Sequence, residues 1–212
     1  MNEAACAESD ARALARLRQA WSARRNLERC EFCACEIQHA HAHLIEPLAR
    51  LIVCSCDACA LLFEGDTGRF RRIPRDVVRF MDLRIETEWQ ALSIPTGLAF
   101  FFFSTAAGRF IALYPSPAGA TEAALALEGW EEIAARHPRL QRMKPDVEAL
   151  LVNRVSNPAE YYLAPIDRCY ELTGSLRKHW RGFTGGDDVW QEVGRFFDRL
   201  RQESSIAETT DA

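Results

Sequence analysis

The chain has 212 residues, of which 48% are hydrophobic and 26% are charged. This balance is typical of a folded globular protein and excludes a disordered or fibrous chain, and the length suffices for one domain of usual size plus a small module. The formal net charge of −4 excludes a general attraction to nucleic acid or anionic lipid, so any such contact would need a local basic patch.

The N-terminal residues predict no export signal. Glu3, Glu8 and Asp10 lie where a signal peptide would carry cationic and then apolar residues. The longest apolar run, residues 98–103, is far shorter than the roughly 20 residues of a membrane-spanning helix. We therefore expect a cytoplasmic protein, in which thiols stay reduced and clustered cysteines are more often metal ligands than disulfides.

The first predicted element is an amphipathic helix over residues 11–27, within an N-terminal segment 1–27. Leu14, Leu17 and Trp21 recur at helical spacing, and Ser9 or Asp10 can cap the helix. Arginines lie between these apolar residues. They fit a solvated helix face better than a docking face for an acidic partner.

Residues 28–66 are predicted to form a small metal-binding module. Cys30 and Cys33 make one C-x2-C pair, and Cys56 and Cys59 make another. Two thiolates at this spacing can point inward from one tight turn, and two such pairs complete a tetrahedral zinc site. We predict one structural zinc ion on these four cysteines, with iron or an iron–sulfur cluster as the alternative ion and buried free thiols as the alternative without metal.

The same segment holds two further cysteines and three histidines at alternating positions. If residues 39–43 are extended, the histidines His39, His41 and His43 point to one side. Three alternatives remain open. A histidine can replace a cysteine in the zinc site, or Cys35, Cys54 and a histidine can form a second site. In the third alternative these side chains are packed or exposed and bind no metal. The possible additional ligands are Cys35, His41, His43 and Cys54.

Residues 67–203 are predicted to form an α+β domain. Strands are expected at residues 97–103, 109–114, 147–155 and 161–164, the first two as a hairpin. Helices are expected at residues 76–83, 130–136, 166–180 and 189–201, whereas residues 120–127 fit a strand or the start of a helix. The polar tail 204–212 is predicted to be disordered. The predicted fold class is α+β, with a small cysteine-ligated zinc module followed by a mainly antiparallel sheet with packed helices.

The cysteine segment carries one resemblance of its own. The string Cys30-x2-Cys33, His43-Leu-Ile-Glu-Pro47 and Cys56-x2-Cys59 resembles the zinc-knuckle frame of HNH-type nucleases and treble-clef modules, in which His43 matches the general base. After Cys59 the chain lacks the asparagine and second histidine with which such an enzyme holds its catalytic ion. The resemblance therefore implies the zinc frame without nuclease activity.

A second resemblance covers nearly the whole chain. It rests on the motifs Cys30-Glu-Phe-Cys33, His41-Ala-His-Leu44, residues 54–63, Tyr114-Pro-Ser-Pro-Ala-Gly119, residues 145–151 and residues 165–170. These resemble a family of uncharacterised bacterial proteins encoded beside nickel–iron hydrogenase subunits and their maturation factors. The resemblance implies an accessory or assembly role.

The predicted function is that of a non-enzymatic zinc-binding accessory protein linked to nickel–iron hydrogenase maturation, with a hydrogenase subunit or maturation factor as partner. One alternative is a metallochaperone or an iron–sulfur electron-transfer protein. The other is a degenerate HNH-like nucleic-acid binder that uses Arg69, Arg71, Arg72 and Arg75. No membrane partner is expected, and nucleic acid is a less favoured partner than protein.

Overall fold

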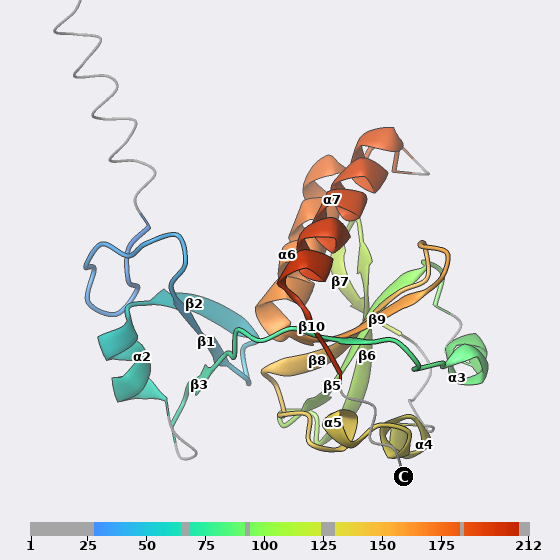
Figure 1. Ribbon diagram of the computed structural model, residues 1–212. Coiled ribbons are helices and arrows are strands. Elements are labelled where there is room, and N and C mark those ends of the chain that lie inside the picture. Colours follow the sequence, from blue (N-terminus) through green and yellow to red (C-terminus); the bar gives the residue numbers. More distant parts are fainter. Residues whose placement is uncertain (1–27, 65–67, 92–93, 124–129, 183–184, 208–212) are drawn as a thin grey trace, which may run out of the picture.

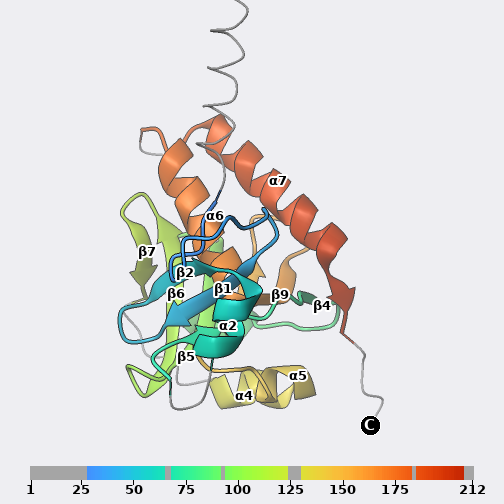
Figure 2. The ribbon, with the colours of Figure 1, turned by 90° about the vertical axis from the view of Figure 1, so that its left-hand side faces the viewer.

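The computed structural model describes residues 28–64, 68–91, 94–123, 130–182 and 185–207. Two sheets lie side by side, a small one of three strands and a large one of seven strands with helices packed on it (Figures 1 and 2). Apart from one parallel pair, the strands are antiparallel, which confirms the predicted fold class. None of the described helices has the length and apolar run that a bilayer crossing requires.

The small sheet has the order β2-β1-β3 and is followed in the chain, after β2, by a short helix. Its elements are β1 (Ala42–Glu46), β2 (Leu51–Ser55), α2 (Asp57–Phe63) and β3 (Arg71–Arg72). Side chains alternate across the β1–β2 hairpin, so Leu44 and Val53 face α2 and pack with Ala42 and Ala60. These four residues, with Phe32 and Phe70 packed against them, form a small apolar cluster on this face of the sheet.

The large sheet has the strand order β10-β4-β9-β8-β5-β6-β7. Its strands are β4 (Val78–Phe80), β5 (Leu98–Ser104), β6 (Arg109–Ser116), β7 (Gly119–Glu122), β8 (Glu148–Asn153), β9 (Glu160–Pro165) and β10 (Ser205–Ile206). The strands predicted near residues 97–103, 109–114, 147–155 and 161–164 are confirmed, as is the β5–β6 hairpin. Residues 119–122 form a strand, which settles the ambiguous segment in favour of a strand as far as it is described.

Helices cover both faces of the large sheet (Figure 1). One face packs on α6 (Ile166–His179) and α7 (Asp187–Glu203), and the other packs on α4 (Trp130–Ala135) and α5 (Pro138–Gln141), while α3 (Glu86–Ala91) lies near the sheet's end. Phe100 and Phe102 of β5 belong to the first cluster, whereas Phe101 belongs to the second. A strand buried on both faces explains the unbroken aromatic run of β5.

Two predictions for the large domain are wrong. Residues 76–83 were expected to be helical, but Val78–Phe80 is strand β4, because Val78 and Phe80 find partners in Leu163 and Tyr161 of β9. The tail was expected to be disordered from residue 204, but Ser205–Ile206 pairs in parallel with β4 as β10. The helix predicted at residues 11–27 lies outside the described residues, and the proposed domain boundaries stay a prediction.

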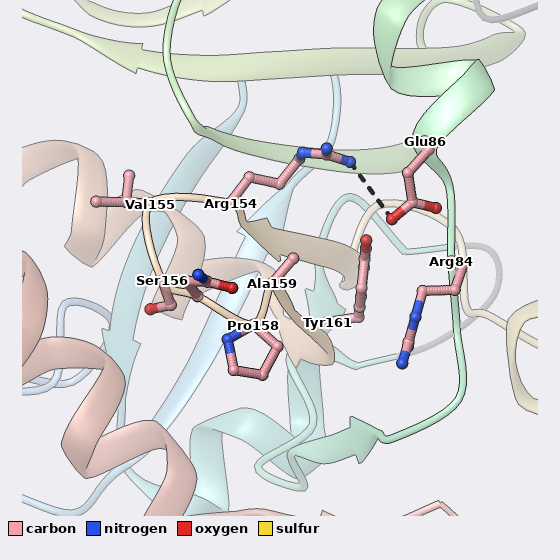
Figure 3. A pocket seen from close by; sticks show the side chains of 9 residues that line it. Arg84, Glu86, Arg154, Val155, Ser156, Pro158, Ala159 and Tyr161 are labelled. Atoms are coloured by element: carbon pink, nitrogen blue, oxygen red, sulfur yellow. Dashed lines mark ion pairs between the residues drawn. The ribbon is translucent and has the colours of Figure 1, made fainter.

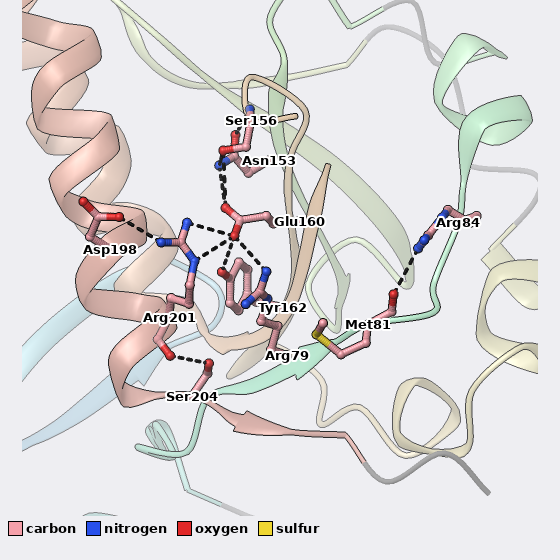
Figure 4. A network of polar contacts seen from close by, with 10 residues as sticks. All are labelled: Arg79, Met81, Arg84, Asn153, Ser156, Glu160, Tyr162, Asp198, Arg201 and Ser204. Carbon is pink, nitrogen blue, oxygen red and sulfur yellow. Dashed lines mark hydrogen bonds and ion pairs between the residues drawn. The ribbon is translucent and has the colours of Figure 1, made fainter. Parts of the chain in front are cut away.

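A buried carboxylate ties the large sheet to α7 (Figure 4). Glu160 of β9 has a side chain only 4% exposed, and it accepts hydrogen bonds from Arg79 (3.1 Å) of β4 and Arg201 (3.0 Å) of α7. The hydroxyl of Tyr162 (3.1 Å) and the amide of Asn153 (3.1 Å) also donate to it. Buried charges are stable only when paired and hydrogen-bonded in this way.

The two sheets are joined by apolar and polar contacts. Ile45 of β1 packs into the cluster that includes α6 and α7. Arg71 of β3 donates to the buried Asp146 (2.7 Å), which also accepts from the backbone N–H of Thr105 (2.9 Å). The small sheet therefore rests against the large domain on a shared apolar contact flanked by an ion pair.

Candidate metal centre

The first arm of the candidate metal centre is the turn at residues 30–34. The backbone N–H of Ala34 donates to the carbonyl of Cys30 (2.8 Å), and the N–H of Cys30 donates to the carbonyl of Cys35 (2.9 Å). Ala34 has a φ of +59°, in the left-handed region that a residue with a side chain adopts only in tight turns. This reversal lets Cys30 and Cys33 present their sulfur atoms to one point.

The second arm is the start of α2. Strand β2 ends at Ser55, and Cys56 then caps the helix, its sulfur accepting the backbone N–H of Cys59 at 3.4 Å. The N–H of Glu31 donates to the carbonyl of Cys54 at 2.9 Å. This bond fastens the first turn directly to the end of the hairpin, so the two arms face each other.

The sulfur atoms of the two arms converge. Those of Cys30, Cys33, Cys35 and Cys56 all lie within 4.8 Å of one another, and Cys33 and Cys56 are 3.8 Å apart. The thiol of Cys59 interacts with Cys56, Cys33 and Cys30. The structure thus brings three of the four predicted ligands together with Cys35, which makes four sulfurs, the number that a tetrahedral ion needs. The fourth predicted ligand, Cys59, lies beside this group and not within it.

Backbone N–H groups favour the thiolate form of a cysteine in this cluster. Burial raises the pKa of Cys30, but the N–H groups of Cys56, Cys33 and Phe32 donate to its sulfur and lower the pKa to about 6 overall. Hydrogen bonding to Cys33, together with burial, raises the pKa of Cys35 to about 12. One anionic sulfur therefore suppresses ionisation of the next. A bound cation would remove that conflict, so the residues fit a thiolate-bound metal ion.

Aromatic side chains cover the outside of the turn. The ring of Phe32 stacks on Phe63 of α2 at 4.5 Å and meets Phe70 edge-on at 5.2 Å. Such pairs add to the apolar burial of their rings. They hold the first arm against the helix that carries the second.

His41, His43 and Cys54 form a separate group, in which one ligand atom of each lies within 4.8 Å of the others. Cys35 belongs to the first cluster and not to this one, while His39 is exposed and lies in neither. A ring nitrogen of His43 is 2.7 Å from a carboxylate oxygen of Asp167. Sequence reasoning missed Asp167, because 124 residues separate it from His43 and no local pattern links them.

The basic stretch after the module is largely neutralised by carboxylates. Its ion pairs are Arg69 with Glu46 (2.6 Å), Arg71 with Asp146 (2.7 Å) and Arg72 with Glu64 (3.3 Å). The guanidinium of Arg69 holds the pKa of Glu46 below its usual value. These arginines therefore offer little free positive charge to a phosphate backbone.

A hollow on the large domain lies away from the cysteines, beside α3 and the loop between β8 and β9 (Figure 3). Arg84, Glu86, Arg154 and Tyr161 line it, and Arg154 forms a long ion pair with Glu86 at 3.9 Å. The lining is polar and holds no sulfur or histidine ligand. This hollow therefore offers no thiol or imidazole ligand for a metal ion.

Comparison with known proteins gives one family. A family of unknown function, DUF5947, has a model that matches residues 29–204. No curated protein and no solved structure matches the chain. The matched range begins just before Cys30, so it includes the cysteine cluster as well as the large sheet.

Proposed function

The chain belongs to the DUF5947 family, and from this premise we propose that it is a non-enzymatic accessory protein whose thiolate-bound zinc ion holds a protein-docking module in shape. The observation that carries the proposal is the convergence of the Cys30, Cys33 and Cys56 sulfurs, with Cys59 beside them. Four thiolates in a closed shell are the usual structural zinc site, which leaves no open position for catalysis. Cys30, Cys33, Cys56 and Cys59 are the proposed ligands.

The small core of the module supports a structural role for the ion. Its own apolar cluster has four buried residues with Phe32 and Phe70 packed against them, and Ile45 packs on the large domain, which is little burial for a segment of this length. In such modules the free energy of metal binding is the free energy of folding. The turn, hairpin and helix that carry the cysteines would then depend on the ion.

Exposed leucines on the module support docking of a protein. Leu61 and Leu62 of α2 are 64% and 74% exposed, and Leu48 at the hairpin end is 83% exposed. Large apolar side chains gathered on one small element mark interaction surfaces more often than isolated ones do. The proposed occupant is a hydrogenase subunit or maturation factor in the cytoplasm, as the resemblance of the whole sequence implies.

The exposed Cys35 favours a second candidate, a metallochaperone. A fifth thiol beside four ligands can enter the coordination sphere as another leaves, which is how an ion is passed between sites. The same cysteines would then hold a labile ion, or iron instead of zinc. The nucleic-acid alternative is disfavoured by the ion pairs of Arg69, Arg71 and Arg72.

Metal analysis and X-ray absorption on the purified full chain test the proposal. Structural zinc predicts a colourless protein with a tightly held ion surrounded by four sulfurs, whereas a brown protein or an ion lost to a weak chelator would point to the second candidate. Cys56→Ser should lose this ion and become less soluble, while Cys169→Ala, which removes a buried thiol of α6, should keep it. A soluble Cys56→Ser protein with unchanged zinc would contradict the proposal.

Partner binding is tested by purifying a tagged chain from cells that express a nickel–iron hydrogenase operon. Hydrogenase subunits or maturation factors should be retained by the native chain and depleted with Leu62→Ser, which leaves the zinc in place. Equal retention by both chains, or no retention of these proteins, would remove the docking role.

A further inference from the structure

We propose that His41, His43 and Cys54 form a second metal site, distinct from the four-thiolate centre, that binds one divalent transition ion of the zinc and cobalt type with an open coordination position. This inference goes beyond the proposed structural role of the first ion. It rests on the hairpin register, on the hydrogen bonds of both imidazoles and on one buried nitrogen without a partner.

The register of the hairpin places the three side chains on one face. His43 of β1 lies directly opposite Cys54 of β2, and His41 precedes His43 by two residues. Directly opposed residues and residues two apart share a face of a strand pair, with Cβ atoms close enough for their side chains to meet. One ligand atom from each residue accordingly falls within 4.8 Å of the others, and the two imidazole centroids are 4.6 Å apart.

Hydrogen bonds of both rings favour one tautomer. The Nδ1 of His41 lies 2.8 Å from the carbonyl oxygen of Gln38, which can only accept, so this nitrogen carries the hydrogen. The Nδ1 of His43 lies 2.7 Å from a carboxylate oxygen of Asp167, which fixes the same arrangement. In a neutral imidazole the other nitrogen, Nε2, then carries a lone pair. Carbonyl and carboxylate partners on the far nitrogen are what orients the histidines of known metal sites.

One of these lone pairs is buried without a partner. The His41 side chain is 6% exposed, and its Nε2 has no hydrogen-bond partner among the described residues. A buried acceptor left unpaired costs free energy, and native structures rarely leave one in place without a reason. A cation held between this nitrogen, His43 and Cys54 would satisfy it.

The charge around the group favours a cation. A carboxylate oxygen of Glu28 lies 3.2 Å from the His41 ring, and Glu31 accepts the backbone N–H of Cys54 at 2.8 Å. Two nitrogens and one sulfur suit zinc and cobalt rather than calcium or magnesium, which take oxygen ligands.

The site has room for a fourth ligand. Three protein ligands leave one position of a tetrahedron for water or for a group from a partner. The His43 side chain is 30% exposed, so solvent reaches the group on the His43 side. We expect this ion to bind more weakly, and to exchange faster, than an ion enclosed by four thiolates.

Titration of the full chain, isolated with zinc in the four-thiolate centre, tests the second site. Added Co²⁺ or Zn²⁺ should bind as a second equivalent that a mild chelator removes, and X-ray absorption of the Co²⁺ form should show nitrogen and sulfur neighbours together. His41→Ala/His43→Ala should lose the second equivalent and keep the first. His39→Ala, a neighbouring histidine outside the group, should keep both.

Three results would overturn the second site. They are a native chain that takes up no second equivalent, a second equivalent that survives unchanged in His41→Ala/His43→Ala, and a second ion with only oxygen neighbours. Cys54→Ser serves as the backup variant if the double substitution does not fold, and it should also lose the second ion. None of these results concerns the first ion, so the two proposals fail separately.

Asp167 is a positioning residue in this proposal. Removing a carboxylate that orients a ligating histidine typically weakens metal binding about 10-fold or more. Asp167→Ala should show that loss at the second site only, and Asp167→Asn, which keeps an acceptor oxygen, should restore part of the affinity. Equal affinity in all three chains would remove Asp167 from the site.

Discussion

The small and large sheets of this protein differ in how much apolar surface they bury. The large sheet buries aromatic and aliphatic side chains on both faces, under α6 and α7 on one side and α4 and α5 on the other. The small sheet and α2 share a cluster of only four buried apolar residues, near a group of converging sulfurs, and Ile45 of β1 packs on the large domain instead. Under the proposed function, the large sheet is stabilised by apolar burial, whereas the small sheet beside it depends on a bound ion.

The largest expected effect is loss of the small sheet on removal of the proposed zinc ion. Structural zinc sites supply about 10 kcal/mol or more of folding free energy, which the module's core cannot replace. Treatment with a strong chelator, or Cys56→Ser, should abolish amide protection in β1 and β2 and leave β8 and β9 protected. Hydrogen exchange read by mass spectrometry checks this, and β1 amides that stay protected after chelation would break the comparison.

A cavity in the large sheet should lower the stability of the domain without changing its metal content. Phe101 is fully buried, and truncating such a side chain to alanine costs about 3–5 kcal/mol. Phe101→Ala should therefore lower the denaturant midpoint of the domain and leave the zinc content of the folded chain unchanged. Met81→Ala, at a side chain 54% exposed, is the control and should change stability by less than about 0.5 kcal/mol.

Glu160 offers a smaller test within the large domain. Glu160→Gln keeps the shape of the side chain but leaves Arg79 and Arg201 without their shared anion, at a cost of about 2 kcal/mol because both arginines are partly exposed. Asp198 is a surface partner of the same Arg201, and its side chain is 63% exposed. Asp198→Asn should therefore cost less than about 1 kcal/mol. Chemical denaturation measures both, and equal costs would show that burial of Glu160 is unimportant.

The smallest effect on stability is expected on the exposed face of α2. Leu62 is 74% exposed, so Leu62→Ser should change the free energy of unfolding by less than about 0.5 kcal/mol. Its effect should appear only in partner retention. Met81→Ser, an exposed apolar residue of the large domain, should alter neither quantity; a large stability loss with Leu62→Ser would place that side chain in the fold instead of at an interface.

Local patterns predicted the parts of the structure that local physics decides. The aromatic run of β5 predicts a buried strand, and the apolar spacing of α7 predicts a helix. Both predictions work because neighbouring residues show how often the chain buries a side chain. Strand β4 was misread as a helix because its conformation comes from pairing with β9, about 80 residues later. Likewise, Cys35 joins the sulfur cluster through the tight turn at Ala34, which the spacing of the cysteines alone does not reveal.

Contacts between distant segments account for the rest of what was missed. Asp167 reaches His43 only because the first turn of α6 is packed beside the hairpin, and Glu160 gathers its arginines from β4 and α7. Each partner taken alone is an ordinary charged residue on an amphipathic element. Their roles emerge from the packing of elements, which a single sequence does not encode in any local signal.

Strand β10 covers one border of the large sheet with the last part of the described chain. The N–H groups of Ser205 and Ala207 donate to the carbonyls of Val77 and Arg79, at 3.0 and 2.8 Å. Without these residues, the outer rim of β4 would present unsatisfied backbone groups to any extended peptide nearby, the circumstance in which β proteins self-associate. Pairing by these few residues therefore reduces the tendency of β4 to bind another strand. A shortened chain that ended at α7 would lose this pairing.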